Sequence, residues 1–380
     1  MAGSAENAPT WRSSFPAMGT RVDIIGWGGD GMAIVNAVVG IVARHEDMWS
    51  VFRPSSEVSQ LNATVRDAAR GDGTSRCGSD SAQAGPGLVV SEDTDRLLRD
   101  ALALAEATGG AFNPLIGPLV AAWDVKAMRA AYVAGAPLPP APAADTVEAA
   151  SRASSWSLLS RVGEQRWAMG VPCESVGGVD VASPRLDLGG IAKGYTADAC
   201  RDLAVSMGAR GVLVSVGTSS VSVFGTRADG SSWRAGLRDP HGGPTSVAGV
   251  VELPAGGMSS LSTSGDNLGP LGGVGVGCAA ERAAGSTSDR RARETPRETS
   301  VGGGRVFDHH IIDPRTGYPA HAGVRQVSVV ASSGVLAEAL STALLVEPSI
   351  DVPDVVARWA RVTGAPASAK VVGLVRAAQG

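Results

Sequence analysis

Between Val212 and Leu253, four short runs of β-branched and other apolar residues follow one another with only short turns between them. Parallel strands need a crossover connection of about a dozen residues or more, usually a helix, whereas antiparallel strands can be joined by a tight turn. The spacing therefore favours a mixed, largely antiparallel sheet over a doubly wound parallel one. The strand-like runs of the chain are Val22–Ile25, Val212–Val216, Val221–Phe224, Trp233–Leu237, Val247–Leu253 and Gln326–Val330.

Helical periodicity marks four other segments, so the sheet is expected to carry flanking helices. One begins at Ser91, a good N-cap residue followed by Glu92 and Asp93 in the first turn, and it ends at Gly109 and Gly110. The other three cover about 32–48, 191–208 and 335–346. Glycine accounts for 50 of the 380 residues, which disfavours a predominantly helical bundle. The predicted fold class is α+β.

The overall composition excludes several classes of protein. With 44% hydrophobic residues, the chain can form a core, so disorder of the whole is excluded. The 37 acidic and 33 basic residues nearly balance, which argues against a nucleic-acid partner. The longest apolar stretch, Met32–Ala43, is shorter than the roughly 20 residues of a membrane helix, so no membrane insertion is expected. The first 20 residues lack a secretory signal pattern, and the four cysteines are scattered, which together predict a cytoplasmic protein.

Changes in composition along the chain predict one domain with expanded loops. We expect a disordered N-terminus over 1–14, a single domain over 15–350 and a C-terminal extension over 351–380. Three segments rich in Gly, Pro, Ser or Ala are expected to be loop insertions, at about 63–87, 134–144 and 268–304. The last contains GGVGVG, which lacks the spacing of a phosphate-binding loop and is interpreted as a linker.

The segment from Leu186 to Tyr195 (LDLGGIAKGY) is the first with potential for chemistry. A brief apolar strand is expected to run into a double glycine and then into a helix, with Lys193 one turn inside it. This geometry brings backbone N–H groups and a helix N-terminus close to an anion. A tight turn followed by a solvated lysine explains the same residues equally well.

The segment from His309 to Pro319 (HHIIDPRTGYP) is the second. Asp-Pro-Arg-Thr-Gly is good turn chemistry by itself, because Asp caps the turn and Gly permits positive φ. Two adjacent histidines, in a chain that has only five, favour a functional role over a purely structural turn.

The third is the helical segment from Leu336 to Ala343. Glu338 and Thr342 are four residues apart, so they lie on the same face of the helix. A carboxylate and a hydroxyl at this spacing suit a hard, oxygen-preferring cation such as Mg²⁺. The alternative, that both side chains simply face solvent, stays open from the residues alone.

Seven segments of the chain, read in order, resemble the ApbE family of FAD:protein FMN transferases. The resemblance spans about Phe15 to Val346, with every block in the family's order and only the loops between them expanded. The seven blocks are Met18–Thr20, Phe52–Glu57, Thr108–Pro114, Leu186–Tyr195, Thr263–Asp266, His310–Pro319 and Ala337–Leu344.

This resemblance implies a magnesium-dependent enzyme with FAD as its substrate. FMN would pass to a Ser or Thr hydroxyl within a short flavinylation motif of an acceptor protein, and AMP would be released. Mg²⁺ would be held by the side chains of Glu338 and Thr342 and by the backbone carbonyl of Gly190. The catalytic candidates are His310, which would activate or orient the acceptor hydroxyl, and Asp266. The residues implied to lie along FAD are Met18, Phe52, Ala111, Phe112, Asn113, Asp187, Lys193 and Ile312.

The chain departs from the family pattern at several of these positions. Glu338 stands where the family usually has aspartate, and Phe52 where it usually has tyrosine. Asn113 replaces an aspartate, Gly217–Thr218 replaces a glycine pair, and the long insertion follows the fifth block. Two other functions therefore stay open: an FAD pyrophosphatase that releases FMN and AMP, and a non-catalytic FAD-binding protein. The motifs could also be only structural turns of an α+β domain.

Overall fold

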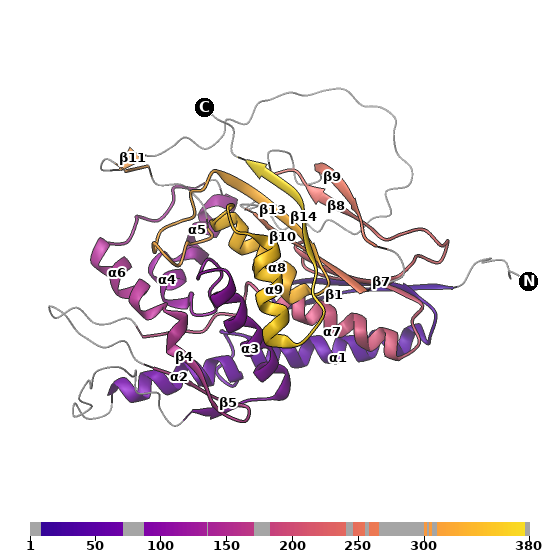
Figure 1. Cartoon of the computed structure of the whole chain (residues 1–380), viewed down its shortest axis with the longest axis horizontal. Helices are drawn as coiled ribbons and strands as arrows, with labels where there is room; N and C mark the ends of the chain where they lie inside the picture. Colours follow the sequence, from indigo (N-terminus) through magenta and orange to yellow (C-terminus); the bar gives the residue numbers. More distant parts are fainter. Residues whose placement is uncertain are drawn as a thin grey trace, which may run out of the picture.

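The computed structural model describes residues 9–70, 87–134, 136–170, 183–240, 246–254, 258–265, 300–301, 304–305 and 310–376. The main sheet has the strand order β1-β2-β6-β7-β10-β13-β14, and every neighbouring pair in it is antiparallel. Figure 1 labels five of its strands, β1, β7, β10, β13 and β14. The predicted α+β class with a largely antiparallel sheet is confirmed. The strands are β1 (Thr10–Ala17), β2 (Thr20–Trp27), β6 (Gly211–Val216), β7 (Ser220–Gly225), β10 (Met258–Gly265), β13 (Val324–Ala331) and β14 (Ala369–Arg376).

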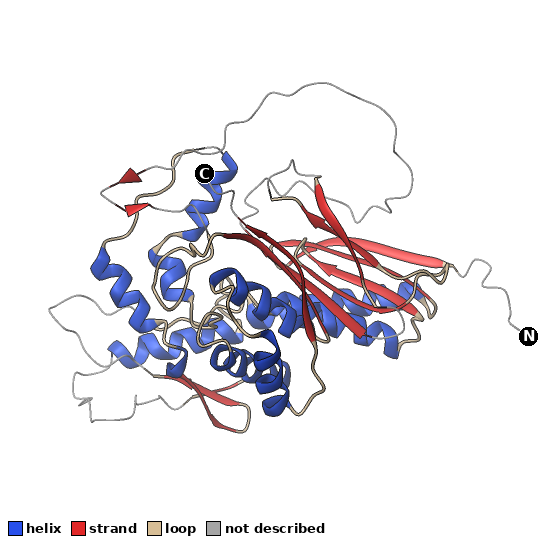
Figure 2. Cartoon of the chain, turned by 45° about the horizontal axis from the view of Figure 1, so that its top comes forward, coloured by secondary structure: helices blue, strands red, loops and turns tan. Residues whose placement is uncertain are grey.

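Both faces of this sheet are covered, because its strands alternate between two hydrophobic clusters. On β6, Val212 and Val214 pack with one cluster, whereas Leu213 packs with the other. The first cluster lies under helices α1 (Gly31–Trp49) and α7 (Ala192–Ser206), and α8 (Gly334–Val346) packs against β10 and β13. Figure 2 shows the helices along the sheet. The second cluster is covered by the hairpin of β8 (Arg234–Arg238) and β9 (Val247–Glu252).

A second, mostly helical part of the chain packs beside the sheet. A continuous core joins Leu61 and Leu97 of this part to Leu336 of α8 and Val327 of β13. Its elements are α2 (Glu57–Arg70), α3 (Glu92–Ala107), α4 (Gly117–Ala122), α5 (Val125–Ala134), α6 (Ala144–Ala153), α9 (Val352–Thr363), and a small sheet of β3 (Leu88–Val89), β5 (Arg166–Met169) and β4 (Leu159–Gly163). A further short hairpin pairs β11 (Ser300–Val301) with β12 (Gly304–Arg305).

The four predicted helices are present as α1, α3, α7 and α8, and the six predicted strands are present as β2, β6, β7, β8, β9 and β13. Ser91 caps α3, because its side chain accepts a hydrogen bond from the N–H of Thr94. The helix ends before Gly109 and Gly110, whose φ angles of 60° and 81° are easy for glycine alone.

The predicted limits of the domain were too narrow at both ends. Residues 10–14, expected to be disordered, form the first half of β1, and their backbone pairs with β2. The indole of Trp11 secures this edge by donating a hydrogen bond to the carbonyl of Gly28 at 2.9 Å. The expected C-terminal extension contains α9, which packs on α3, and β14, which pairs with β13 in the main sheet. Residues 10–14 and the elements α9 and β14 therefore belong to the domain.

Two internal predictions also need correction. Residues 63–70, expected to begin a loop insertion, continue α2, because Val58, Leu61 and Val65 form one buried helical face. The strand expected before Gly189 is irregular instead. The side chain of Asn62, not a partner strand, pairs with the N–H and carbonyl of Leu186 at 2.7 and 3.1 Å.

Most of the other predicted insertions lie outside the described residues, as do Cys77, Cys173, Cys278, His309 and Asp266. Residues 136–143, within the predicted insertion at 134–144, have neither helix nor strand. Among the helices that the structure describes, none is long and apolar enough to cross a membrane.

Candidate active site

The loop from Leu186 to Ile191 is fixed by its neighbours before it enters α7. The N–H of Asp187 donates to the carbonyl of Pro114 at 2.8 Å, and the Asp187 carboxylate accepts from the N–H of Gly189 at 2.8 Å. The ammonium of Lys193 folds back and donates to the Gly189 carbonyl at 2.7 Å. Gly189 and Gly190 remain exposed at the surface. The loop therefore presents backbone groups to solvent from a rigid position.

Helices α7 and α8 cross in direct backbone contact at Gly194 and Gly334. A Cβ atom built on Gly194 would overlap the carbonyl oxygen of Gly334, and one built on Gly334 would overlap the carbonyl oxygen of Gly194. Neither position can hold a larger residue without separating the helices. This contact brings the first turn of each helix to the first turn of the other.

Each helix sends a carboxylate to the other at this crossing. Glu338 Oε2 accepts a hydrogen bond from the N–H of Gly194 at 2.8 Å, and Asp198 Oδ2 accepts one from the N–H of Gly334 at 2.6 Å. Each carboxylate lies four residues after the glycine of its own helix. The N-terminus of α8 is thereby satisfied by Asp198, since Ser333 at the N-cap position makes no side-chain cap bond.

Glu338 is buried, so the alternative in which it faces solvent is wrong. Glu338 is only 3% exposed. The hydroxyl of Ser220, on β7, donates to Oε1, and Lys193 Nζ lies 3.5 Å from the same oxygen. A buried carboxylate is costly unless its oxygens are hydrogen-bonded and its charge is compensated. Here two donors and one ammonium meet that requirement.

The carbonyl of Gly190 is left open by this arrangement. In a regular helical turn the N–H of Gly194 would donate to the carbonyl of Gly190. That N–H donates to Glu338 instead, and within the described part of the chain no hydrogen bond reaches the Gly190 carbonyl. Gly190 is an exposed residue, so in the described part of the chain its carbonyl oxygen keeps its full acceptor capacity.

Thr342 lies one helical turn after Glu338 and is half-buried. Its hydroxyl is 3.0 Å from the hydroxyl of Ser264, which also lies 2.8 Å from that of Ser341. Ser264 stands at the end of β10, two residues before Asp266, which falls outside the described residues.

The segment Ala111–Asn113 packs against the glycine loop. All three residues are buried, and a Cβ atom on Gly190 would lie 3.7 Å from Phe112 Cε2. The Asn113 amide donates to the carbonyl of Ser154 at 2.5 Å and accepts from the N–H of Leu115 at 2.8 Å. Phe112 therefore lies next to the loop, while Asn113 holds the turn that places it.

Phe52 lies elsewhere, on the wall of an open cleft of about 790 Å³. Its ring is 80% exposed, and Lys126 Nζ is 5.9 Å from the ring centroid. Asn62, which fixes Leu186, lines the same cleft, so the cleft adjoins the glycine loop. The other lining residues are Val51 and Pro54 and residues of α2, α4, α6 and the segment 183–185.

Met18 and Ile312, also implied to lie along FAD, have clear packing roles. Met18 lies in the turn between β1 and β2 with a φ of 51°, and it packs against the first cluster under α1 and α7 and against the continuous core of the helical part. Ile312 is buried in a third cluster with Leu119 and Trp123.

His310 is half-buried at the start of the predicted turn, which is braced internally. Arg315 forms two hydrogen bonds to the buried carboxylate of Asp313, both at 3.0 Å. The indole of Trp123 donates to the carbonyl of Gly317 at 2.7 Å. The turn that follows His310 is therefore rigid.

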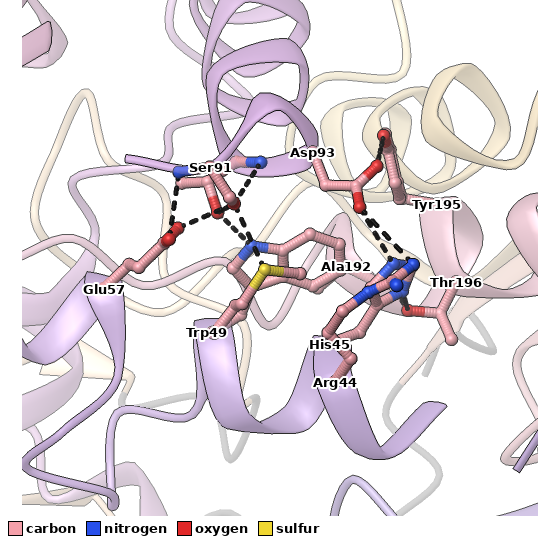
Figure 3. A network of polar contacts seen from close by, with 11 residues as sticks. Arg44, His45, Trp49, Glu57, Ser91, Asp93, Ala192, Tyr195 and Thr196 are labelled. Atoms are coloured by element: carbon pink, nitrogen blue, oxygen red, sulfur yellow. Dashed lines mark hydrogen bonds and ion pairs between the residues drawn. The ribbon is translucent and has the colours of Figure 1, made fainter. Parts of the chain in front are cut away.

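A polar network behind the site ties the first turn of α7 to α1 and α3 (Figure 3). Thr196 donates to the carbonyl of Ala192, so the imidazole of His45 must donate from Nδ1 to the Thr196 hydroxyl, at 3.0 Å. The hydroxyl of Tyr195 donates to Asp93 at 2.9 Å. Burial lowers the pKa of His45 to about 4, against the attraction of Asp93. The network holds Lys193 and Gly194 in place from behind.

The roles of Gly194, Asp198 and Ser220 were not predicted from the sequence, although the sequence contains signals for them. Gly194 and Asp198 share with Gly334 and Glu338 the same pattern, a glycine followed four residues later by an acid. Serines also alternate along β7 and β10, which predicts one polar face on each strand.

Comparison with known proteins identifies the family of this chain. A family model described as the ApbE family matches residues 18–275 and 284–363. The FAD:protein FMN transferase of Treponema pallidum is 32% identical over 322 residues, which cover 83% of this chain and 71% of that protein. The transferase of the same name from Rhodobacter capsulatus is 27% identical over 92% of this chain and 54% of its own length.

Solved structures agree on the fold. The crystal structure of the ApbE protein from Thermotoga maritima has a TM-score of 0.63 at 24% identity, covering 97% of both chains. The flavin transferase ApbE from Vibrio cholerae has a TM-score of 0.62 at 21% identity, covering 98% of both chains. The family model spans most of this chain and the treponemal relative is 32% identical, so the chain belongs to the ApbE family.

Proposed function

We propose that this protein transfers FMN from FAD to a Ser or Thr hydroxyl of an acceptor flavoprotein and releases AMP. Membership of the ApbE family supports the reaction class. The observation that carries the proposal is the crossing of α7 and α8, which brings Lys193 to Glu338 and bonds Glu338 to the N–H of Gly194, four residues after the open Gly190 carbonyl. A carboxylate, an ammonium and a rigid backbone loop are what pyrophosphate cleavage requires, because that chemistry depends on positioning and charge neutralisation.

The donor set also fits a magnesium ion. We propose Glu338, the Thr342 hydroxyl and the Gly190 carbonyl as its protein ligands, all of them hard oxygen donors. No three His, Cys, Asp or Glu side chains gather as a metal site among the described residues, so a site built from these residues must also use other oxygens. The open Gly190 carbonyl supports this set, since its usual helical donor is committed to Glu338. When bound, such an ion would act as a Lewis acid on the pyrophosphate oxygens.

The protein groups would act on the substrate as follows. The exposed ring of Phe52 offers a face on which a planar ring can stack, in a cleft walled partly by alanines and prolines. The Lys193 ammonium would neutralise charge on the pyrophosphate.

The acceptor hydroxyl oxygen would form a new bond to the phosphorus of the FMN phosphate, the bond to the bridging oxygen would break, and AMP would leave with that oxygen. His310 is the proposed base that takes the hydroxyl proton, with Asp266 as the second catalytic candidate.

The remaining features of the proposal concern partners and location. The acceptor is proposed to be a flavoprotein with a Ser or Thr flavinylation motif. A cytoplasmic location stays a prediction from the scattered cysteines, of which Cys200 is a buried free thiol.

The test combines two products in one assay. Purified protein is incubated with FAD, Mg²⁺ and a panel of acceptor domains, and AMP release and acceptor mass are measured together. Transfer predicts AMP together with an acceptor mass gain of one FMN, both abolished by a chelator. Glu338→Gln should lose both products, whereas the matched variant Glu106→Gln, at an exposed position of α3, should retain them. AMP without modified acceptor would show hydrolysis of FAD instead, and bound FAD without either product would contradict catalysis.

A further inference from the structure

Ser220 occupies a buried position at the beginning of β7. It is 1% exposed, and its neighbours across the sheet are Val216 on β6 and Ser262 on β10. Its hydroxyl donates to Glu338 Oε1, although the two residues are 118 positions apart in the chain. No position in the recognised sequence motifs includes this serine.

The same face of the sheet supplies serines to two different carboxylates. Ser222 and Ser260 each donate to Asp198 Oδ1 at 2.6 Å, and Asp198 is also paired with the buried Arg201 at 2.9 Å. Asp198 is thus saturated by protein donors. Glu338 receives one serine, one backbone N–H and a more distant ammonium, so its oxygens keep lone pairs that no donor in the described part of the chain uses.

A hydroxyl is suited to fixing a metal ligand in this position. A glutamate side chain has three rotatable torsions, and ordering them costs entropy that a bound ion would otherwise have to offset. The Gly194 N–H fixes Oε2 and the Ser220 hydroxyl fixes Oε1, so the carboxylate is held from both sides before any ion arrives. The serine hydroxyl is neutral, so it leaves the negative charge of the carboxylate available to a cation.

We propose that Ser220 is a positioning residue that holds the Glu338 carboxylate ready for a divalent ion. The proposal rests on the proposed function, since it assumes that Glu338 is a metal ligand. Outer-shell partners of this kind typically contribute about 10- to 100-fold to metal affinity.

The test compares Ser220→Ala with Ser222→Ala, which removes a buried hydroxyl from the same face of the same strand but from the other carboxylate. Mn²⁺ is titrated into each protein and followed by its electron paramagnetic resonance signal, while FAD affinity and thermal stability are measured separately. We expect Ser220→Ala to bind Mn²⁺ about tenfold or more weakly, with FAD affinity changed less than about twofold. Ser222→Ala should lose stability but keep its Mn²⁺ affinity.

The possible failures are distinguishable. Wild-type Mn²⁺ affinity in Ser220→Ala, or equal weakening in Ser222→Ala, would overturn the role of Ser220 and leave the metal site intact. A wild-type protein that binds FAD but no Mn²⁺ would overturn the proposed metal site, and the role of Ser220 with it. A Ser220→Thr variant, which restores the hydroxyl, should recover Mn²⁺ affinity if the bond itself matters; a folded Ser220→Thr protein as weak as Ser220→Ala would contradict it.

Discussion

Gly194 and Gly334 meet backbone to backbone, and each donates its N–H to a carboxylate carried by the other's helix. The close approach and the two cross-helix hydrogen bonds depend on each other, because a wider separation would pull both carboxylates out of reach. The candidate ligands on α8 are thereby fixed relative to the glycine loop before α7.

Gly194→Ala is expected to destabilise the protein, because the new Cβ would overlap backbone atoms of Gly334, which cannot move aside as a side chain could. Overpacking of this kind costs about 1–3 kcal/mol and occasionally more. Chemical denaturation measures the loss. The matched control is Gly40→Ala in α1, where nothing lies within 4 Å of the added atom. That change should raise stability by about 0.5–1 kcal/mol. Equal effects from the two variants would contradict the close crossing.

Asp198→Asn is expected to cost about 3 kcal/mol of unfolding free energy, because it leaves the buried Arg201 guanidinium without its main counter-charge. Asp202 also pairs with Arg201, but its side chain is 52% exposed. Asp202→Asn should therefore cost less than about 1 kcal/mol. Denaturant unfolding of both variants measures the two losses of unfolding free energy. Comparable losses would show that Asp198 is not the dominant partner of Arg201.

His45 makes stability depend on pH in the acidic range. Burial lowers its pKa to about 4, from an ordinary value of 6.5, so the unfolded chain takes up a proton first as the pH falls. The neutral imidazole of His45 contributes fully to the free energy of unfolding above pH 6.5. This contribution decreases by on the order of 2 kcal/mol as the pH falls toward 4. The facing groups are Asp93 and Tyr195, with Arg44 beside it.

His45→Asn tests this prediction, because asparagine keeps a donor but does not titrate. The difference in unfolding free energy between wild type and variant should be constant above pH 7 and should shrink steadily below pH 6. A difference that does not change between pH 7 and pH 4.5 would contradict the burial of a neutral imidazole.

Asp100 should act in the opposite direction. Burial raises the pKa of its carboxyl to about 6, although Arg99 and Arg96 oppose the shift. The folded state then binds the proton more tightly, so stability is greater at low pH and falls as the pH rises from about 4 through about 6. Asp100→Asn should remove this loss and stabilise the protein at pH 7 by on the order of 1 kcal/mol. A variant that is less stable than wild type at pH 7 would show that the charged form is favoured.

Sequence alone predicts those elements whose hydrophobic pattern is local. The runs at Val212–Val216 and Val247–Leu253 and the capped helix after Ser91 all formed where the pattern placed them. Strand β1 was missed because its inward face is only half-buried and is broken by a serine: Trp11, Phe15 and Ala17 pack against the first cluster, but Ser13 lies between them. Strand β14 was also missed, since only its pairing with β13 defines it.

The candidate site likewise has features that local sequence predicts and features that depend on residues far away in the chain. The spacing of Glu338 and Thr342 could be recognised from local sequence, whereas the burial of Glu338 depends on Ser220 and Gly194, which lie 118 and 144 positions away. Such partners carry no local pattern, because one hydroxyl or one backbone N–H can come from any strand or helix that the fold brings near. The hydrogen bonds between the Asn62 side chain and the backbone of Leu186, 124 positions away, were unpredictable for the same reason.

Phe52 offers the most direct test of how the cleft binds its ligand. Its ring is 80% exposed, so Phe52→Ala should leave the melting temperature nearly unchanged. If the ring stacks on a planar part of FAD, its loss should weaken FAD binding by about 1–3 kcal/mol, or roughly 5- to 150-fold, measured by flavin fluorescence. Phe52→Tyr keeps the stacking face and should bind FAD within about threefold of wild type. Met32→Ala, which removes another exposed apolar side chain on α1, is the control for general surface effects. FAD affinity that is equal in wild type and Phe52→Ala would place the flavin nucleotide outside this cleft, and would leave the exposed ring without a role in the proposed reaction.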